Sequence, residues 1–302
     1  MGNLRTALLA WLFARSTGRR FLLRIEDLDR TRAGSEAGQL RDLAAVGLDW
    51  DGEIIRQTER TEIYLDAIAQ LRKAGLVYEC FCTRREVAEA ASAPHAPPGA
   101  YPGTCRNLTE EQRARRRRER PAALRLRSSV DEFTVTDELH GSYTSAVDDL
   151  VLLRNDGVPS YNLAVVLDDA LQGIDQVVRG DDLLSSAPRQ AYLGSLLGLP
   201  PVSYAHVPLA LNSEGRRLAK RDGAVTLPDL AAAGLDADAV RTLILGSLGL
   251  PGYLAEALAE FSPARLPLEP WIFDPAALDT VALDTAAPNT HAAARRGPRT
   301  FS

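Results

Sequence analysis

Apolar residues in the first part of the chain follow two spacings, one typical of helices and one typical of strands. Helices are predicted at residues 4–15, 39–47 and 61–73, where apolar side chains recur at every third or fourth position. Short apolar runs at residues 21–25 and 76–82 predict strands. Because helices and strands alternate, we expect an α/β fold with a parallel sheet.

The pattern changes after residue 77. Residues 91–104 are rich in Ala, Pro and Gly and predict a loop, whereas residues 109–120 predict a highly charged helix that begins with Thr109 as its cap. Alternating polar and apolar positions at 123–127 and 133–135 predict antiparallel strands. We therefore interpret residues 78–145 as an α+β subdomain inserted into the α/β domain.

Helices and strands alternate again in the second half. Strands are predicted at 150–153, 176–180 and 204–210, and helices at 161–169, 187–198 and 236–248. From about residue 277 no periodicity remains, which predicts a disordered tail. The predicted parts are the first half of the α/β domain at 1–77, the insertion at 78–145, the second half at 146–227, a small helical part at 228–276 and the tail at 277–302.

Composition narrows the possible functions and locations. The chain has 302 residues, is 45% hydrophobic and carries a net charge of −5, which excludes a generic nucleic-acid coat and would require a local basic face for any nucleic acid. No apolar run has the length of a membrane helix, and the N-terminus lacks the plan of a signal peptide. Three cysteines favour a reducing compartment, so we expect a cytoplasmic protein.

Two charged segments are candidates for ligand binding. Residues 216–223 place several cations before an Asp-Gly turn, and Lys220 among them would suit a polyphosphate as a point charge. A solvated basic turn is the alternative. Glu26 follows the predicted strand 21–25, at the strand end where open α/β sheets bind ligands. A helix cap within a solvated loop is the alternative there.

The three cysteines form a candidate metal site. Cys80, Cys82 and Cys105 would supply three thiolates, and a structural zinc ion takes four ligands. The candidates for the fourth ligand are His95 and Tyr101, and chemistry favours His95 because tyrosine must lose a proton with a pKa of about 10. Three buried free thiols are the alternative. Nothing nucleophilic surrounds the cluster, so the zinc would be structural.

A series of motifs resembles the class I aminoacyl-tRNA synthetases of the glutamyl group. Residues 2–7 are similar to the end of the His-Ile-Gly-His signature, and residues 24–29 to the amino-acid-binding strand. Residues 161–169 and 178–184 resemble the group's second half, and 217–221 its Lys-Met-Ser-Lys-Ser loop. The resemblance implies a Rossmann-type parallel sheet with an inserted zinc-binding α+β subdomain and a small helical C-terminal part.

Within the glutamyl group, the chain resembles the short members that act on queuosine in tRNA(Asp). It ends soon after the Lys220 loop, which leaves no room for an anticodon-binding domain, and its cysteines resemble the zinc site of those members. In that site Tyr101 takes the fourth position, against the chemical preference for His95. The resemblance thus implies one structural zinc ion held by Cys80, Cys82, Tyr101 and Cys105.

The resemblance also implies a ligase reaction in two steps. Glutamate would attack the α-phosphate of ATP, whose oxygens Mg²⁺ bridges, and glutamyl-adenylate would pass its glutamate to queuosine in tRNA(Asp). Activation would not need tRNA. The implied residues are Gly2, Asn3 and Lys220 for ATP, with Lys220 catalytic, and Glu26, Tyr161 and Arg179 for glutamate.

These residues would have distinct roles. Lys220 would stabilise charge on the triphosphate, Glu26 would hold the ammonium group of glutamate, and Tyr161 would complete the pocket. Arg179 would pair with the γ-carboxylate in bidentate fashion. A structural salt bridge from Arg179 to Asp181 or Asp182 is the alternative.

The arginine-rich segment at 109–120 is a candidate contact for tRNA phosphates. Its arginines surround the predicted helix, so a solvated surface helix is the alternative. We expect a monomer with no membrane contact. The arginines are Arg113, Arg115, Arg116, Arg117, Arg118 and Arg120.

The N-terminus departs from the group's pattern. The group begins with a strand, a Pro-Ser-Pro-Thr-Gly turn and a His that contacts phosphate, whereas here Met1 directly precedes Gly2. We expect the true start to lie upstream, and weak or no activity with reduced stability for the chain as it stands. The alternatives are a truncated tRNA(Glu) synthetase, a catalytically impaired zinc- and RNA-binding paralogue, and a general nucleotidyltransferase.

Overall fold

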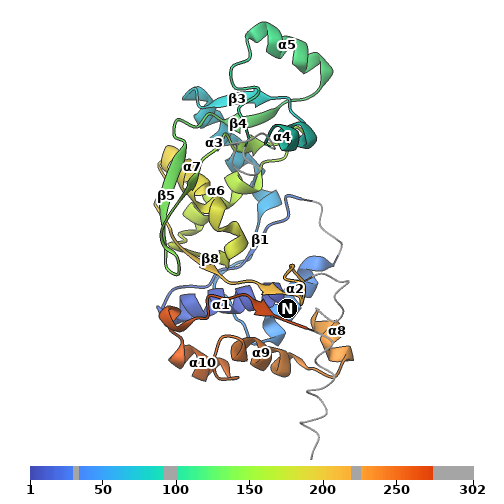
Figure 1. Cartoon of the computed structure of the whole chain (residues 1–302), viewed down its shortest axis with the longest axis vertical. Helices are drawn as coiled ribbons and strands as arrows, with labels where there is room; N and C mark the ends of the chain where they lie inside the picture. Colours follow the sequence, from blue (N-terminus) through green and yellow to red (C-terminus); the bar gives the residue numbers. More distant parts are fainter. Residues whose placement is uncertain (30–33, 92–100, 219–225, 275–302) are drawn as a thin grey trace, which may run out of the picture.

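The protein is described from a computed structural model, which describes residues 1–29, 34–91, 101–218 and 226–274. Figure 1 shows an elongated molecule, with helix α1 (Gly2–Ser16) and the C-terminal helices at one end and helix α5 (Glu110–Glu119) at the other. His95, Lys220 and the tail predicted at 277–302 lie outside the described residues.

The described strands form four sheets. β1 (Arg24–Ile25) pairs in parallel with β2 (Ile55–Arg56), and β10 (Ala210–Leu211) pairs in parallel with β11 (Trp271–Ile272). The two larger sheets have the strand orders β6-β5-β9-β8 and β3-β4-β7. Their strands are β3 (Val77–Cys80), β4 (Ala123–Leu126), β5 (Glu132–Asp137), β6 (Gly141–Ala146), β7 (Val151–Leu153), β8 (Gln176–Gly180) and β9 (Ser203–Val207).

The four-stranded sheet joins segments that are far apart in the sequence. β8 and β9 are parallel, β5 and β6 form an antiparallel hairpin, and β5 meets β9 in parallel at Asp137 and Tyr204. This hairpin lies within the predicted insertion 78–145, yet it pairs with strands of the second half. The carboxylate of Asp137 contributes to this pairing, because it accepts hydrogen bonds from the backbone N–H and the imidazole of His206 on β9.

The strands predicted at 76–82 and 150–153 form, but not in a parallel sheet. β3 and β7 both pair antiparallel with β4, which lies between them. The prediction of a parallel sheet was therefore wrong for these two strands. Apolar spacing identifies a strand without identifying its partner, so alternation with helices was a poor guide here. The division into domains stays a prediction.

Most predicted helices are confirmed, with small shifts in their bounds. Thr109 caps α5 as predicted, through a capping box with Gln112. Ser160 caps α6 by accepting a hydrogen bond from the Leu163 N–H. The other described α-helices are α2 (Ser35–Ala45), α3 (Thr61–Lys73), α4 (Arg84–Ala91), α6 (Tyr161–Gln172), α7 (Ala187–Leu196), α8 (Leu227–Ala232), α9 (Ala237–Gly246) and α10 (Leu254–Glu260).

One hydrophobic core lies where α1 packs against β9 and the C-terminal helices. Leu8, Leu12 and Phe13 of α1 are almost completely buried there, together with Ile244 of α9. The rings of Phe13 and Phe261 meet edge to face with centroids 5.2 Å apart. By packing against the strands that carry candidate site residues, α1 therefore supports them.

A second core surrounds a buried polar hub in α6. Asp168 is fully buried and accepts hydrogen bonds from the Tyr64 hydroxyl at 2.7 Å and the Gln57 amide at 3.1 Å. It also forms an ion pair with Arg60 at 2.7 Å. These contacts fix α3 and the segment after β2 against α6. None of the helices in the described part of the chain combines the length and apolarity needed to cross a membrane.

Candidate active site

The three residues predicted to bind glutamate approach one another. Glu26 follows β1, Tyr161 begins α6, and Arg179 lies in β8. Partial burial raises the pKa of Tyr161, the negative charge of Glu26 raises it further, and the positive charge of Arg179 opposes both. Tyr161 therefore lies within electrostatic range of the two charged side chains.

Arg24, which the sequence did not single out, orients Glu26. One guanidinium nitrogen of Arg24 lies 3.2 Å from Glu26, and the other contacts Asp169 at 2.8 Å and Gln172 at 2.9 Å. Burial raises the pKa of Asp169, and Arg24 opposes that rise. Glu26 and Asp169 also line a cavity of about 480 Å³ between β1, β8 and α1.

Arg179 is held by neutral groups. Its Nε donates to Nε2 of His206 at 3.0 Å, and its Nη1 donates to Oε1 of Gln190 at 2.7 Å. Its guanidinium carbon lies 5.5 Å from the ring centroid of Tyr204. Among the described residues Arg179 forms no ion pair, and Asp182 pairs with Arg217 instead. The positive charge of Arg179 is thus available to a ligand.

The first turn of α1 borders a cavity of about 440 Å³. Gly2, Asn3, Arg217 and Thr226 are among the residues that line it. The first N–H groups of a helix lack partners within the helix, and its N-terminus carries partial positive charge, so this arrangement suits a phosphate. Lys220 itself is outside the described residues, but the described segments that flank it, ending at Leu218 and resuming at Thr226, both border this cavity.

The three cysteines converge as a candidate metal site. Their sulfur atoms all lie within 4.8 Å of one another, with 3.5 Å between Cys82 and Cys105. The Tyr101 hydroxyl lies 3.3 Å from the sulfur of Cys80 and 3.8 Å from that of Cys82. Tetrahedral zinc with bonds of about 2.3 Å places its sulfur ligands about 3.8 Å apart, so the four groups fit that ion.

Hydrogen bonds within the cluster favour a thiolate at Cys80 and neutral side chains at Cys105 and Tyr101. Hydrogen bonds from Cys105 and Tyr101 lower the pKa of Cys80 to about 4, and nearby Arg125 adds to the effect. Hydrogen bonding to Cys80 and burial raise the pKa of Cys105, and burial raises the pKa of Tyr101. The guanidinium of Arg125 stacks 3.7 Å above the Tyr101 ring centroid. A cation there would stabilise thiolate and phenolate ligands around a metal.

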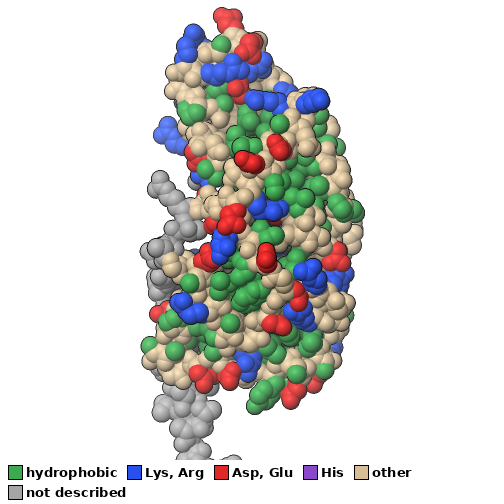
Figure 2. All heavy atoms as spheres, turned by 180° about the vertical axis from the view of Figure 1, so that it is seen from behind, with side chains coloured by type: hydrophobic (Ala, Val, Ile, Leu, Met, Phe, Trp, Pro, Cys, Tyr) green, Lys and Arg blue, Asp and Glu red, His purple; other side chains and the backbone are tan. Residues whose placement is uncertain are grey.

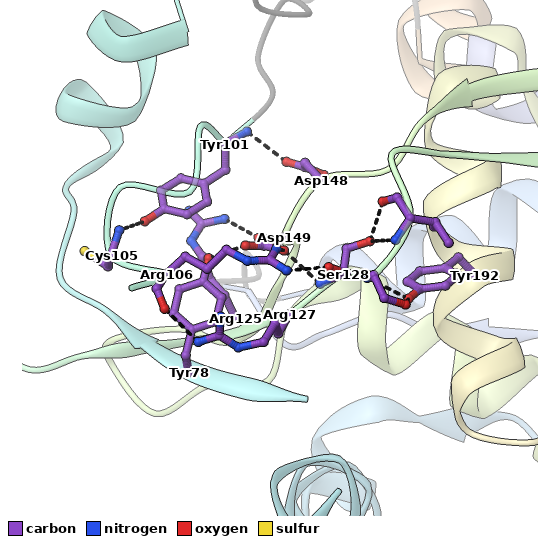
Figure 3. Close-up of polar contacts among 12 residues, drawn as sticks. Tyr78, Tyr101, Cys105, Arg106, Arg125, Arg127, Ser128, Asp148, Asp149 and Tyr192 are labelled. Atoms are coloured by element: carbon purple, nitrogen blue, oxygen red, sulfur yellow. Dashed lines mark hydrogen bonds and ion pairs between the residues drawn. The ribbon is translucent and has the colours of Figure 1, made fainter. Parts of the chain in front are cut away.

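Two adjacent aspartates connect the cluster to the rest of the molecule (Figure 3). Asp148 accepts a hydrogen bond from the Tyr101 N–H at 3.0 Å and pairs with Arg189 of α7 at 2.9 Å. Asp149 accepts from the Tyr78 hydroxyl at 2.6 Å and pairs with Arg106 at 2.6 Å. The segment carrying Tyr101 and Cys105 is therefore tied to both β3 and α7.

A cavity of about 830 Å³ lies between the cysteine cluster and Tyr161, one of the residues predicted to bind the substrate glutamate. It is lined by Cys80 and Cys82 on one side and by Tyr161 and Asn162 at the start of α6 on another. Arg125, which is 9% exposed, also lines it. A substrate group that enters this cavity would reach Tyr161.

The arginines of α5 are partly neutralised. Arg117 pairs with Glu79 at 2.6 Å and Glu110 at 2.7 Å, and Arg113 pairs with Glu110 at 2.9 Å. Figure 2 shows basic and acidic side chains interspersed at this end of the molecule. Arg116 and Arg118 are exposed, and the described residues offer them no ion pair. They are therefore exposed cations of the helix that remain available to an external anion.

Sequence analysis missed four residues that orient the site. Arg24 and His206 are polar residues inside otherwise apolar strands, and such positions often indicate a buried hydrogen bond. That signal could have identified both. Asp137 and Gln190 have no comparable signal, because each stands in a stretch that also carries exposed polar residues.

Known proteins similar to this chain share one family. Residues 1–265 match the family described as tRNA synthetases class I (E and Q), catalytic domain. A glutamyl-Q tRNA(Asp) synthetase from Nocardia farcinica is 64% identical over 274 residues, which cover 90% of this chain and 88% of that protein. One from Cutibacterium acnes is 56% identical over 256 residues, which cover 83% of this chain and 73% of that protein.

A similar solved structure is glutamate-tRNA synthetase from Elizabethkingia anophelis. The two folds agree with a TM-score of 0.77 at 27% identity. The match covers 92% of this chain and 66% of that chain, so the present chain spans about two thirds of its length. Together with the family match over residues 1–265, this similarity means that the chain has the catalytic-domain fold of the class I tRNA synthetases (E and Q) and belongs to that family.

Proposed function

We propose that this chain is a ligase that activates glutamate with ATP and transfers it to queuosine in the anticodon of tRNA(Asp). The proposal takes its acceptor from the names of the relatives that are 64% and 56% identical. The observation that carries it is the approach of Glu26 and Arg179 to Tyr161. A carboxylate and a guanidinium within electrostatic range of the same hydroxyl suit the ammonium and side-chain carboxylate of glutamate.

In the proposed first step, an oxygen of the glutamate α-carboxylate attacks the α-phosphorus of ATP and pyrophosphate leaves. Gly2 and Asn3 at the start of α1, with Lys220, bind the ATP phosphates, and Lys220 stabilises the charge that develops on the leaving group. The Mg²⁺ that accompanies ATP would neutralise part of the negative charge on the phosphates when bound. Glu26, Tyr161 and Arg179 hold glutamate in line for the attack.

In the second step, a hydroxyl of the queuosine cyclopentenediol attacks the carbonyl carbon of glutamyl-adenylate and AMP leaves. The cavity of about 830 Å³ beside Tyr161 offers an entry for that nucleoside. The hydroxyl gives up its proton to the departing AMP or to solvent. Because the α-carboxyl carbon is already activated as a mixed anhydride with AMP, the step needs orientation more than a nucleophilic side chain.

A structural zinc ion completes the proposal. Cys80, Cys82, Tyr101 and Cys105 would hold it, and the spacing of their side-chain atoms supports this ligand set. Tyr101 is the proposed fourth ligand because its hydroxyl already faces Cys80 and Cys82. When bound, the ion would cross-link β3 and the segment before α5, without a part in the chemistry. We also propose a cytoplasmic monomer, since a reducing compartment keeps such thiols free.

Two assays test the proposed function. Exchange of pyrophosphate into ATP should depend on glutamate and proceed without tRNA. Labelled glutamate should be transferred to tRNA(Asp) that carries queuosine, and not to tRNA(Asp) without queuosine or to tRNA(Glu). Transfer to tRNA(Glu) would show that the acceptor is wrong, and absence of glutamate-dependent exchange would refute the activation step.

A further inference from the structure

A buried acidic and imidazole pair lies directly behind Arg179. Asp137, at the end of β5, is 2% exposed, and His206, in β9, is fully buried. Oδ2 of Asp137 lies 2.6 Å from Nδ1 of His206 and 3.0 Å from the His206 backbone nitrogen. The other oxygen of Asp137 accepts from the N–H groups of Leu139 and His140. The carboxylate is thus fully engaged and rigidly placed.

Donor and acceptor rules fix the protonation of His206. Arg179 can only donate, and its Nε lies 3.0 Å from Nε2 of His206. Nε2 must therefore carry a lone pair, which leaves the ring proton on Nδ1, where it is donated to Asp137. His206 is therefore a neutral imidazole with its proton on Nδ1. It links the fixed carboxylate of Asp137 to the guanidinium of Arg179.

The guanidinium of Arg179 is restrained along two edges. His206 accepts from Nε, and Gln190, which is 2% exposed, accepts from Nη1. Gln190 is itself held, because its amide donates to Asn162 at 2.9 Å. Within the described part of the chain, the remaining Nη2 makes only a long contact of 3.5 Å to the Leu183 carbonyl. N–H groups of the Arg179 guanidinium therefore remain available to a ligand, while the two hydrogen bonds restrain rotation of the guanidinium plane.

We propose that Asp137 and His206 are positioning residues that fix Arg179 so that its free N–H groups select a carboxylate over a carboxamide. The inference rests on the proposed function, because it takes Arg179 as the partner of the glutamate side chain. A carboxylate presents only acceptors, whereas a carboxamide presents one acceptor and an NH₂ donor. A fixed guanidinium forces that donor to face an N–H, whereas a mobile one could rotate away and tolerate glutamine.

The isosteric variant Asp137→Asn tests this arrangement without opening a cavity. If the asparagine oxygen stays with the Leu139 and His140 N–H groups, its NH₂ faces Nδ1 of His206. The imidazole must then accept at Nδ1 and carry its proton on Nε2, which points a donor at the Nε–H of Arg179. The variant should misplace Arg179 although residue 137 never touches the substrate.

Two substitutions at His206 separate positioning from folding. His206→Leu removes the acceptor for Arg179, whereas His206→Gln can return an oxygen close to the position of Nε2. His140→Phe is the matched control, because the His140 ring contacts the His206 carbonyl oxygen at 3.1 Å but has no link to the Arg179 side chain. Circular dichroism and thermal unfolding of each variant report whether it has folded.

Pyrophosphate exchange is then measured at varied glutamate, glutamine and ATP. For Asp137→Asn and His206→Leu we expect the KM for glutamate to rise about tenfold or more, with the KM for ATP within about twofold of wild type. The preference for glutamate over glutamine in kcat/KM should narrow by a similar factor. His206→Gln should recover most of the loss, and His140→Phe should behave as wild type.

The outcomes distinguish this inference from the proposed function. An active wild type whose folded Asp137→Asn and His206→Leu variants keep the KM for glutamate and the preference over glutamine would overturn the inference alone. Parallel losses for glutamate and ATP, or no recovery in His206→Gln, would show a merely structural role and also overturn it. A wild type without glutamate-dependent exchange would overturn both.

Discussion

Arg179 carries its charge in a site where its hydrogen-bond partners are neutral. An arginine that forms no ion pair with the described residues should gain most from an anionic ligand, because the ligand supplies a hydrogen-bonded counter-charge. We expect Arg179→Ala to lower kcat/KM for glutamate by about a hundredfold or more, while ATP still binds. Glutamate-dependent pyrophosphate exchange measures the expected loss of kcat/KM, and a separate ATP-binding measurement checks that ATP still binds.

Arg179→Lys is the matched variant for charge without the planar fork. It keeps a cation but cannot reach His206 and Gln190 together, so we expect activity between that of Arg179→Ala and wild type. Exchange that is unchanged in Arg179→Ala would remove this residue from the glutamate site.

Asp168 is a buried carboxylate that stabilises the packing around α6, the helix that begins with Tyr161. Its oxygens are engaged by Tyr64, Gln57 and Arg60, and it is fully buried. Asp168→Ala leaves the Arg60 charge without its partner in a partly buried position. We expect a loss of about 3 kcal/mol in the free energy of unfolding, measured by urea denaturation.

The control is Asp66→Ala, since Asp66 is exposed on α3, the same helix that carries Tyr64. Surface substitutions of this kind usually change stability by less than about 0.5 kcal/mol. Equal midpoints for the two variants would mean that the hub contributes little.

At the scale of elements, α5 carries two kinds of arginine. Some form ion pairs with glutamates, and others are exposed and form no ion pair with the described residues. Arg116 and Arg118 are exposed, whereas Arg117 is engaged by Glu79 and Glu110. If α5 contacts tRNA phosphates, the double variant Arg116→Gln/Arg118→Gln should bind tRNA more weakly. The slope of log affinity against log salt concentration should also become shallower by about one for each lost phosphate contact. Titrations of tRNA binding at several salt concentrations measure that slope.

Arg117→Gln serves as the comparison within the same helix. Its charge is balanced by two glutamates, so its removal should change the salt slope less than removal of Arg116 and Arg118. If both variants keep the wild-type slope, α5 is a solvated surface helix rather than an RNA contact.

The elements also reveal which parts of the fold the sequence could predict. α3 and α5 carry local signals, namely helical spacing and the Thr109 capping box, and their positions were predicted closely. The partners of β3, β5 and β7 depend on contacts distant in sequence, such as the hydrogen bonds between Asp137 and His206. No local spacing encodes those contacts, so the sheet order could not be predicted.

The candidate site divides in the same way. Glu26, Tyr161 and Arg179 were predicted by resemblance to a known motif series, and Glu26 and Arg179 lie within electrostatic range of Tyr161. The groups that orient them, Arg24 and His206, are themselves held by residues that lie 145 and 69 positions away in the chain, namely Asp169 and Asp137. A motif identifies the residues that touch a substrate more readily than those that hold them in place.

At the scale of the whole molecule, the cysteine cluster lies in the half that contains β3 and β4, far from the core of α1 and α9 (Figure 1). Its connection to α7 runs through Asp148, which holds both the Tyr101 backbone and Arg189. A metal that fixes Cys80 and Cys105 should therefore stabilise this half more than the other.

Removal of the metal tests that expectation. We expect purified protein to contain about one zinc ion per chain, and dialysis against a chelator to lower the thermal midpoint. Native-state hydrogen exchange should then accelerate in β3 and β4, while the amides of α9 keep their protection, because local stability follows local contacts. Cys105→Ala should bind less zinc and lose its response to the chelator. Uniform acceleration across α9 and β3 would instead mean that the two halves unfold as one unit, and unchanged exchange would mean that the cluster needs no metal.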